Sequence, residues 1–241
     1  MFSQSKRFIF FSFSILPLAI LFLACSEDNE KQDKSLNKQP AEEKVTIKDQ
    51  KFYGIESGII EYEISGSQKG DKTLYFKDWG RKQAEFSEST IKVGKYSKRA
   101  NLLKIKSGNW EYILNLASKT GTKRENPVLE KLIEFRDQIS YGEFGEQLAL
   151  INGGVETGSD VIMDKKCRVF EFKSKNLKLW LWNWIILKSE TLTGNIKINV
   201  RAINIKENIA IADSIFKPPL DILITEVDLR SLRMQERENQ F

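Results

Sequence analysis

The chain has 241 residues, of which 41% are hydrophobic and 11% aromatic, enough for the core of one large domain. It has no histidine and only two distant cysteines, Cys25 and Cys167, so it lacks the commonest general base, the commonest metal ligand and any CxxC pair. The net charge is +5, but no basic stripe alternates with aromatic residues, which argues against nucleic acid as a partner.

The N-terminus has the pattern of an export signal. Lys6 and Arg7 precede an apolar segment, Phe8–Leu23, whose length suits a signal peptide better than a membrane span. The segment ends in Leu21-Phe22-Leu23-Ala24-Cys25, which resembles a bacterial lipobox. The resemblance implies cleavage after residue 24 and lipidation of Cys25 by acyl chains such as palmitate. The alternatives are an uncleaved N-terminal anchor and simple secretion with cleavage nearby.

Residues 25–49 are expected to be the lipidated cysteine followed by a disordered tether, because this segment is polar and has almost no large apolar side chain. Ser26 differs from the aspartate that typically retains lipoproteins in the inner membrane. Ser26-Glu27-Asp28 is similar to a surface-export tag of some Gram-negative lineages. We therefore expect a cell-envelope protein that is lipid-anchored in the outer membrane and faces the periplasm or the cell surface.

Alternation of apolar and polar residues predicts a run of short strands from residue 56 onward. Loops fall at Gly66–Gly70 and Ser107–Asn109, and the fifth strand places Trp110 and Tyr112 on one face with Leu114. The expected strands are Glu56–Ser65, Thr73–Trp79, Gln83–Ile91, Ala100–Lys106 and Trp110–Leu116.

Two helices are expected next. Asn126-Pro127 is a typical helix start, since asparagine caps the first turn and proline lacks only an N–H that would be unpaired there. Apolar residues then recur at helical spacing in two stripes, and the open face of the sheet is the natural surface for them. The stripes are Val128, Leu132, Phe135 and Ile139, then Phe144, Leu148 and Ile151.

The segment Arg168–Lys188 predicts a hairpin with its turn at Ser174–Asn176. Its second strand places Trp180, Trp182 and Trp184 on one face and leucine and isoleucine on the other. Such a strand is either covered on both faces by protein or faces a ligand on one side. The three tryptophans, together with Trp110 and Tyr112, are therefore candidates to line a ligand cavity, and the alternative is an ordinary core.

The remaining chain predicts a strand from Ile196 to Ile205, with a bulge near Ala202 where the alternation changes phase, and a last strand within Leu220–Val227. Residues 228–241 are a polar tail. The expected fold is mostly β with a helical insertion. It is one domain, residues 50–227, formed by a curved antiparallel sheet or incomplete β-barrel and closed by two helices.

This arrangement resembles the LolA/LppX-like superfamily of bacterial envelope lipoproteins and lipoprotein carriers. The resemblance rests on the signal peptide, the strand order around a central helical insertion, and the late sequence Asp213–Pro219, in which Phe216 and Pro219 form a "phe-x-x-pro" turn. It implies a half-barrel whose space beneath the helices takes acyl chains of lipids or lipoproteins. No functional residue of that superfamily is transferred to this chain.

Two functions follow as hypotheses. The first is a membrane-anchored lipoprotein that binds a lipid or acyl chain between the sheet and its helices. The second is an interaction lipoprotein with a solid core that binds a protein partner through a sheet edge or face. Enzymatic activity is not expected, because Glu143, Glu146 and Glu156 show no spacing that enforces a catalytic pair, and phosphate-loop and nucleophile-elbow motifs are absent. No metal or cofactor is expected.

Overall fold

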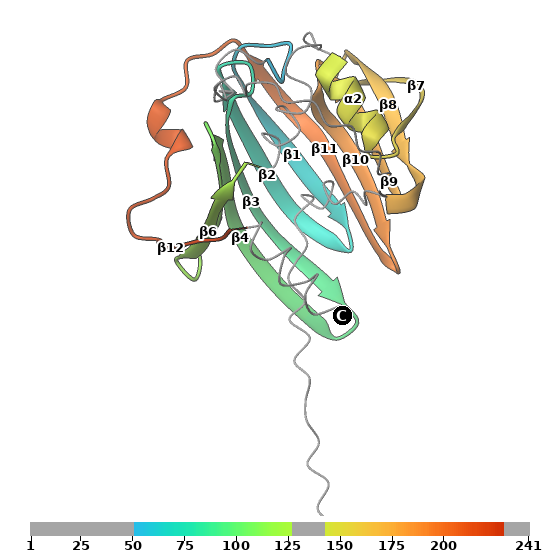
Figure 1. Ribbon diagram of the computed structural model, residues 1–241. Helices are drawn as coiled ribbons and strands as arrows, with labels where there is room; N and C mark the ends of the chain where they lie inside the picture. The colour runs from blue at the N-terminus through green and yellow to red at the C-terminus, as the bar shows by residue number, and fades with distance from the viewer. Residues whose placement is uncertain (1–50, 127–142, 229–241) are drawn as a thin grey trace, which may run out of the picture. The chain divides into compact units, whose positions relative to one another are not determined.

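The computed structural model describes residues 51–126 and 143–228 (Figure 1). The signal segment, Cys25, the tether, the first expected helix and most of the polar tail lie outside the described residues. Within them, no helix is long and apolar enough to cross a membrane.

Twelve strands of the described chain form one large, curved, unclosed sheet (Figure 1), so the predicted fold class is confirmed. The first half contains β1 (Gly58–Gly66), β2 (Gln68–Lys77), β3 (Lys82–Val93), β4 (Tyr96–Ser107), β5 (Trp110–Asn115) and β6 (Thr120–Glu125). The second half contains β7 (Val155–Ile162), β8 (Lys165–Phe172), β9 (Leu177–Trp182), β10 (Ile185–Thr193), β11 (Ile196–Glu207) and β12 (Leu223–Glu226). The helical elements are α2 (Glu143–Ile151) and the short η2 (Lys173–Lys175) and η3 (Asp213–Phe216).

The sheet consists of two meanders joined along β1 and β11. Its order is β12-β6-β5-β4-β3-β2-β1-β11-β10-β9-β8-β7, and every neighbouring pair is antiparallel except β12 with β6. The predicted bulge near Ala202 is confirmed, because Tyr62 pairs with Ala202 while Glu61 pairs with Asn204, so that Ile203 has no partner residue. The bulge explains why the alternation along β11 changes phase.

The sequence analysis misplaced some strands. The predicted loop Gly66–Gly70 is too long. The structure has only a tight turn there, because β2 already begins at Gln68. Strands β6 and β7 were not predicted. Strand β6 is polar, and β7 is an edge strand that is exposed at every position but its last, so no buried face imposes an alternating pattern on it.

The predicted tryptophan strand also differs from the structure. Strand β9 ends at Trp182, and Asn183 and Trp184 form a two-residue hairpin turn with φ of 48° and 61° before β10 begins. Such turns need positive φ at both central positions, which asparagine tolerates and tryptophan rarely adopts. The turn escaped prediction because an indole stands where glycine is usual.

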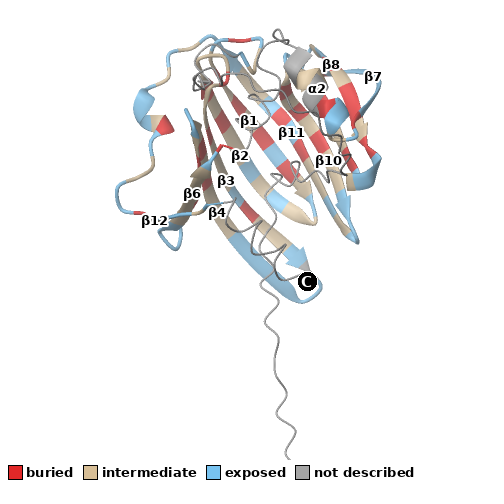
Figure 2. Ribbon diagram, viewed as in Figure 1, coloured by how far each residue is buried: buried red, intermediate tan, exposed pale blue. Residues whose placement is uncertain are grey.

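The buried apolar residues of the described chain form two clusters, and the larger one includes Ile60, Tyr62 and Trp180. We call the face with Ile60, Tyr62 and Ile64 the inner face, and its opposite the outer face. On the outer face, Phe216 of η3 is 3% exposed and packs in one cluster with Leu103 and Leu114. Figure 2 shows buried positions as red bands along β1, β2 and β11. The chain after β11 thus covers the outer face, while the inner face is the surface on which α2 lies.

Candidate functional site

The inner face changes from apolar to charged across the sheet. Residues that pair directly in an antiparallel sheet project to the same side. One row of paired residues is apolar at most positions and consists of Phe170, Leu179, Ser189, Val200 and Ile64, from β8 to β1. Another row starts apolar and becomes charged, with Ile60, Leu74, Glu85 and Lys104, from β1 to β4. The two regions therefore belong to one continuous face.

Helix α2 lies on the apolar end of the inner face. A Cβ added at Gly145 would stand 2.4 Å from the Trp184 ring, so helix and indole are in direct contact. Just after the helix, a Cβ at Gly154 would stand 2.6 Å from the Phe172 ring. Phe172 shares the face of Phe170 because the two are separated by one residue on β8. The predicted placement of this helix on the sheet is confirmed by the contacts at Gly145 and Gly154.

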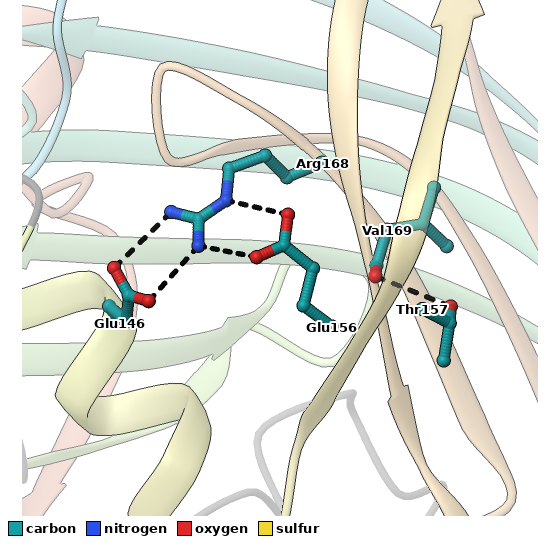
Figure 3. A network of polar contacts seen from close by, with 5 residues as sticks. All are labelled: Glu146, Glu156, Thr157, Arg168 and Val169. Atoms are coloured by element: carbon teal, nitrogen blue, oxygen red, sulfur yellow. Dashed lines mark hydrogen bonds and ion pairs between the residues drawn. The ribbon is translucent and has the colours of Figure 1, made fainter.

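An ion-pair cluster holds α2 to the edge of the sheet (Figure 3). Arg168 of β8 donates from Nε and Nη2 to the two carboxylate oxygens of Glu156 of β7, at 3.0 and 2.7 Å. It also donates to Glu146 of α2, at 3.1 and 3.5 Å. The hydrogen bond from Arg168 lowers the pKa of Glu156 against the opposing effect of burial. We call Arg168, Glu146 and Glu156 the helix latch.

The other end of the inner face carries a set of charged side chains that we call the charged ladder: Lys72, Glu85, Lys104, Lys106, Glu111 and Arg124. Its centre is Glu111, which is 1% exposed. Glu111 accepts a hydrogen bond of 2.6 Å from Nε of Arg124, and Nζ of Lys104 and of Lys106 stand 3.7 and 4.0 Å from its carboxylate. The buried carboxylate of Glu111 therefore compensates the charge of three neighbouring cations.

Burial and neighbouring charges compete within the charged ladder. Burial acts to raise the pKa of Glu85, but Lys72, Lys104 and Lys106 outweigh it and hold the pKa below its usual value. For Lys106, burial is the main cause of a lowered pKa, and the nearby Lys104 adds to it. The ladder is thus a place where positive charge is crowded in a partly desolvated setting.

The three predicted tryptophans do not form one stripe. Trp180 pairs with Val169 and with Lys188, beside the register shift of β10, and packs in the larger buried cluster with Tyr62. Its indole N–H donates to Asp160 at 2.9 Å, and Nζ of Lys188 stands 3.9 Å from the ring centroid. Both Trp180 and Leu179 are 5% exposed, which confirms that this strand is covered on both faces.

The other two tryptophans lie apart from Trp180. Trp182 is partly buried against the large apolar cluster and has Nζ of Lys165 at 4.6 Å from its ring. Trp184 stands in the turn and contacts α2 and Phe170. Of the three, only Trp184 is shown against the described helix.

Trp110 and Tyr112 lie on the outer face of β5. Tyr112 pairs with Ile105 and packs in the cluster covered by Phe216, while Nζ of Lys123 stands 3.5 Å from the Trp110 ring. Six strands separate β5 from β9 along the sheet order. The structure therefore does not bring these two residues together with the tryptophans of β9.

Sequence reasoning missed both charged groups of the inner face. No partner was assigned to Glu146, Glu156 or Arg168, because α2 and β7 meet β8 only in the tertiary structure. A signal for Glu111 did exist. The hairpin turn at Ser107–Asn109 places Lys106 opposite Glu111, and a cross-strand ion pair follows from that register.

Two other features of the described residues bear on function. No group of three or more histidine, cysteine, aspartate or glutamate side chains there is arranged to hold a metal ion. An open hollow of about 620 Å³ lies on β2–β4 and is lined by polar and charged residues such as Asp71, Glu88 and Arg99. It is separate from the tryptophans and from α2.

No protein-family profile matches the chain, and no curated protein matches it. Among solved structures, an uncharacterised conserved protein from Thermus thermophilus is similar with a TM-score of 0.47 and 8% identity over 72% of this chain and 92% of that one. PNGF-II is similar with a TM-score of 0.43 and 14% identity over 77% of this chain and 33% of that one. LprF from Mycobacterium bovis is similar with a TM-score of 0.31 and 9% identity over 67% and 90%.

Proposed function

We propose that this protein is a membrane-anchored envelope lipoprotein of the LolA/LppX-like kind that binds a lipid or acyl chain between the inner face and its helices. The observation that supports it is how α2 is attached. Among the described side chains of α2, Leu150 and Ile151 are 52% and 40% exposed, while Gly145 lies against Trp184 and Glu146 pairs with the latch residue Arg168.

Such an attachment suits a helix that exchanges contacts with the sheet for contacts with a ligand. An exposed ion pair contributes about 1 kcal/mol or less, so the helix latch costs little to open. Each large apolar side chain that moves from water into an apolar setting gains about 1.5–3 kcal/mol. An acyl chain inserted under α2 would give the exposed side chains of Leu150 and Ile151 an apolar neighbour.

Binding of a neutral apolar dye, N-phenyl-1-naphthylamine, to the full chain tests this function. We expect saturable binding to the wild type, and native mass spectrometry is expected to detect co-purified lipid. Phe172→Ala removes an inner-face side chain that is 2% exposed and should weaken dye binding at least about fivefold, the loss of roughly 1 kcal/mol of apolar contact. Leu192→Ala, at a position that is 47% exposed, is the matched control. A wild type that retains no lipid and binds no dye would overturn the proposal.

The anchor is part of the same proposal. Acylation at Cys25 would hold the folded domain at the outer membrane, on the periplasmic side or at the cell surface, with residues 26–49 as the tether. Metabolic labelling with radioactive palmitate should label the wild type and leave Cys25→Ala unlabelled. Label that persists in Cys25→Ala would contradict lipidation at this residue.

A partner-binding function is favoured by one separate observation. Strand β7 is a sheet edge, and Val155 and Val161 are both 58% exposed on it. Edge strands offer unpaired backbone groups to an added strand. If a protein partner binds there, Ser159→Pro should remove a backbone donor and abolish its co-purification, while Ser118→Pro in the β5–β6 turn should not. Equal co-purification by both variants would exclude the edge.

A further inference from the structure

The charged ladder carries more positive than negative charge. Its cations are Lys72, Lys104, Lys106 and Arg124, and its anions are Glu85 and Glu111, so the formal sum is 4 − 2 = +2. The exposed fractions of these six side chains lie between 2% for Glu111 and 35% for Glu85. Removing charge from water is costly unless opposite charge and hydrogen bonds compensate. An additional anion bound at the charged ladder would balance its excess positive charge.

Two lysines of the ladder have hydrogen-bonding capacity left. Nζ of Lys106 has its nearest carboxylate oxygen at 4.0 Å and Nζ of Lys104 at 3.7 Å, both beyond hydrogen-bond length. Glu111 is already taken by Arg124, which donates to it from Nε at 2.6 Å. Each ammonium group has three N–H donors. Both ammonium groups therefore stand near Oε1 of Glu111 without a hydrogen bond to it, and their donors remain available to a further acceptor.

The ladder borders the apolar part of the same face. In the row of paired residues, Lys106 is separated from Phe76 by Gln83 alone, and Phe76 is 1% exposed. Nζ of Lys72 stands 4.4 Å from the centroid of the Tyr62 ring. With neighbouring strands about 4.8 Å apart, the change from charged to apolar side chains takes roughly 10 Å. A molecule with an anionic group and an acyl chain has this same division over a comparable length.

We propose that the charged ladder binds the carboxylate or phosphate group of an acyl amphiphile, with Lys104 and Lys106 as donors and the chain on the apolar side of the ladder. The chain's place rests on the proposed function, whereas the anionic group is selected by the ladder itself. Charge-assisted hydrogen bonds are about twice as strong as neutral ones, so the ladder distinguishes anionic from neutral ligands of equal length.

Calorimetric titration of the full chain with laurate, 1-dodecanol and inorganic phosphate tests this inference. The wild type should bind laurate about tenfold more tightly than dodecanol, which corresponds to one charge-assisted contact. Lys106→Gln should weaken laurate binding about tenfold and leave dodecanol binding unchanged, and Lys104→Gln should act in the same direction. Lys197→Gln, an exposed lysine on the outer side of β11, removes the same charge as a control. Circular dichroism confirms that each variant is folded.

The outcomes separate the two proposals. Equal affinity for laurate and dodecanol, unchanged in Lys106→Gln, would overturn the anionic site while leaving the acyl-binding function intact. Absence of binding by both laurate and dodecanol would overturn both. Phosphate that binds as tightly as laurate would also overturn the inference, because the site would then recognise a free anion. Laurate affinity should fall as salt is raised, since partly exposed cations are screened.

Discussion

At the scale of single residues, the inner face contains two ion-pair clusters of similar chemistry and different energetic weight. Arg168 of the helix latch has a side chain that is 38% exposed, whereas Glu111 of the charged ladder is 2% exposed. Exposed ion pairs contribute little because water and salt screen them, while removal of one partner from a buried pair leaves a charge without compensation. We therefore expect the latch to regulate the position of α2 and Glu111 to support the stability of the sheet.

Glu111→Gln tests how much the charged ladder contributes to the stability of the fold. The substitution keeps the shape of the side chain but leaves Arg124, Lys104 and Lys106 without their shared carboxylate. We expect a loss of about 2–3 kcal/mol in the free energy of unfolding, measured with urea. Glu63→Gln, at an exposed position of β1, should change the stability by less than about 0.5 kcal/mol. An equally small effect of Glu111→Gln would contradict the assignment.

The helix latch should respond to acid. The pKa of Glu156 is lowered by its hydrogen bond from Arg168, so the stabilising contact is fully present above the ordinary carboxyl value of 4.5. It is lost as the pH falls below 4.5 and through the lowered pKa. Nuclear magnetic resonance should then show the Trp184 indole and the amides of α2 shifting together in that range. Arg168→Gln should remove this pH dependence, and an unchanged profile in that variant would exclude the latch as its cause.

At the scale of elements, the docking of α2 depends on the absence of a side chain at Gly145. Alanine normally favours a helix over glycine by about 1 kcal/mol. Here its Cβ would stand 2.4 Å from the Trp184 ring, far inside contact distance, so helix or indole has to move. At Gly145, the greater helix preference of alanine is therefore opposed by its steric clash with Trp184.

Gly145→Ala is expected to loosen α2 rather than stabilise it. Overpacking of this kind typically costs about 1–3 kcal/mol, which exceeds the gain in helix preference. Hydrogen exchange of the α2 amides should become faster by at least about fivefold, equivalent to 1 kcal/mol of local opening. Leu150→Ala, a half-exposed position of the same helix, is the control. Slower exchange in Gly145→Ala would show that the helix does not rest on Trp184.

At the scale of the whole molecule, the pairing of β1 with β11 joins the two meanders into one sheet. The hydroxyl of Tyr62 on β1 donates to the carbonyl oxygen of Ile186 on β10 at 2.9 Å, across β11. That carbonyl lies at a register shift between β9 and β10, where ladder hydrogen bonding is irregular. Burial is the main cause of a pKa of Tyr62 well above its usual value, so the hydroxyl remains a donor.

Tyr62→Phe should weaken both meanders together. Loss of a buried hydrogen bond costs about 1 kcal/mol, and the substitution removes the hydroxyl that donates to the carbonyl of Ile186. Urea unfolding followed by tryptophan fluorescence and by far-ultraviolet circular dichroism should give coincident curves shifted to lower urea. Tyr96→Phe, at a residue that is 84% exposed, should leave the midpoint unchanged. Separate transitions for the two probes would contradict one cooperative sheet.

The sequence predicted those parts of the fold that depend on local pattern. Alternation in Ile60-Glu61-Tyr62 predicted strand β1, the phase change near Ala202 predicted the bulge, and the turn residues at 107–109 predicted the β4–β5 hairpin. These features are local because side-chain direction alternates along a strand and turn geometry selects particular residues. By itself, the sequence thus determined a mostly β domain with an inserted helix.

Only the tertiary structure decided what the two faces of the sheet do. The turn at Asn183-Trp184 separated the tryptophans, since an apolar residue at positive φ gives no local signal. The pairing of β1 with β11 then placed Glu85 and Lys104 on the same face as Leu179 and α2, although no short-range pattern connects them. Long-range register determines which side chains share a face, and the combination of a charged ladder with an apolar surface arises from that register alone.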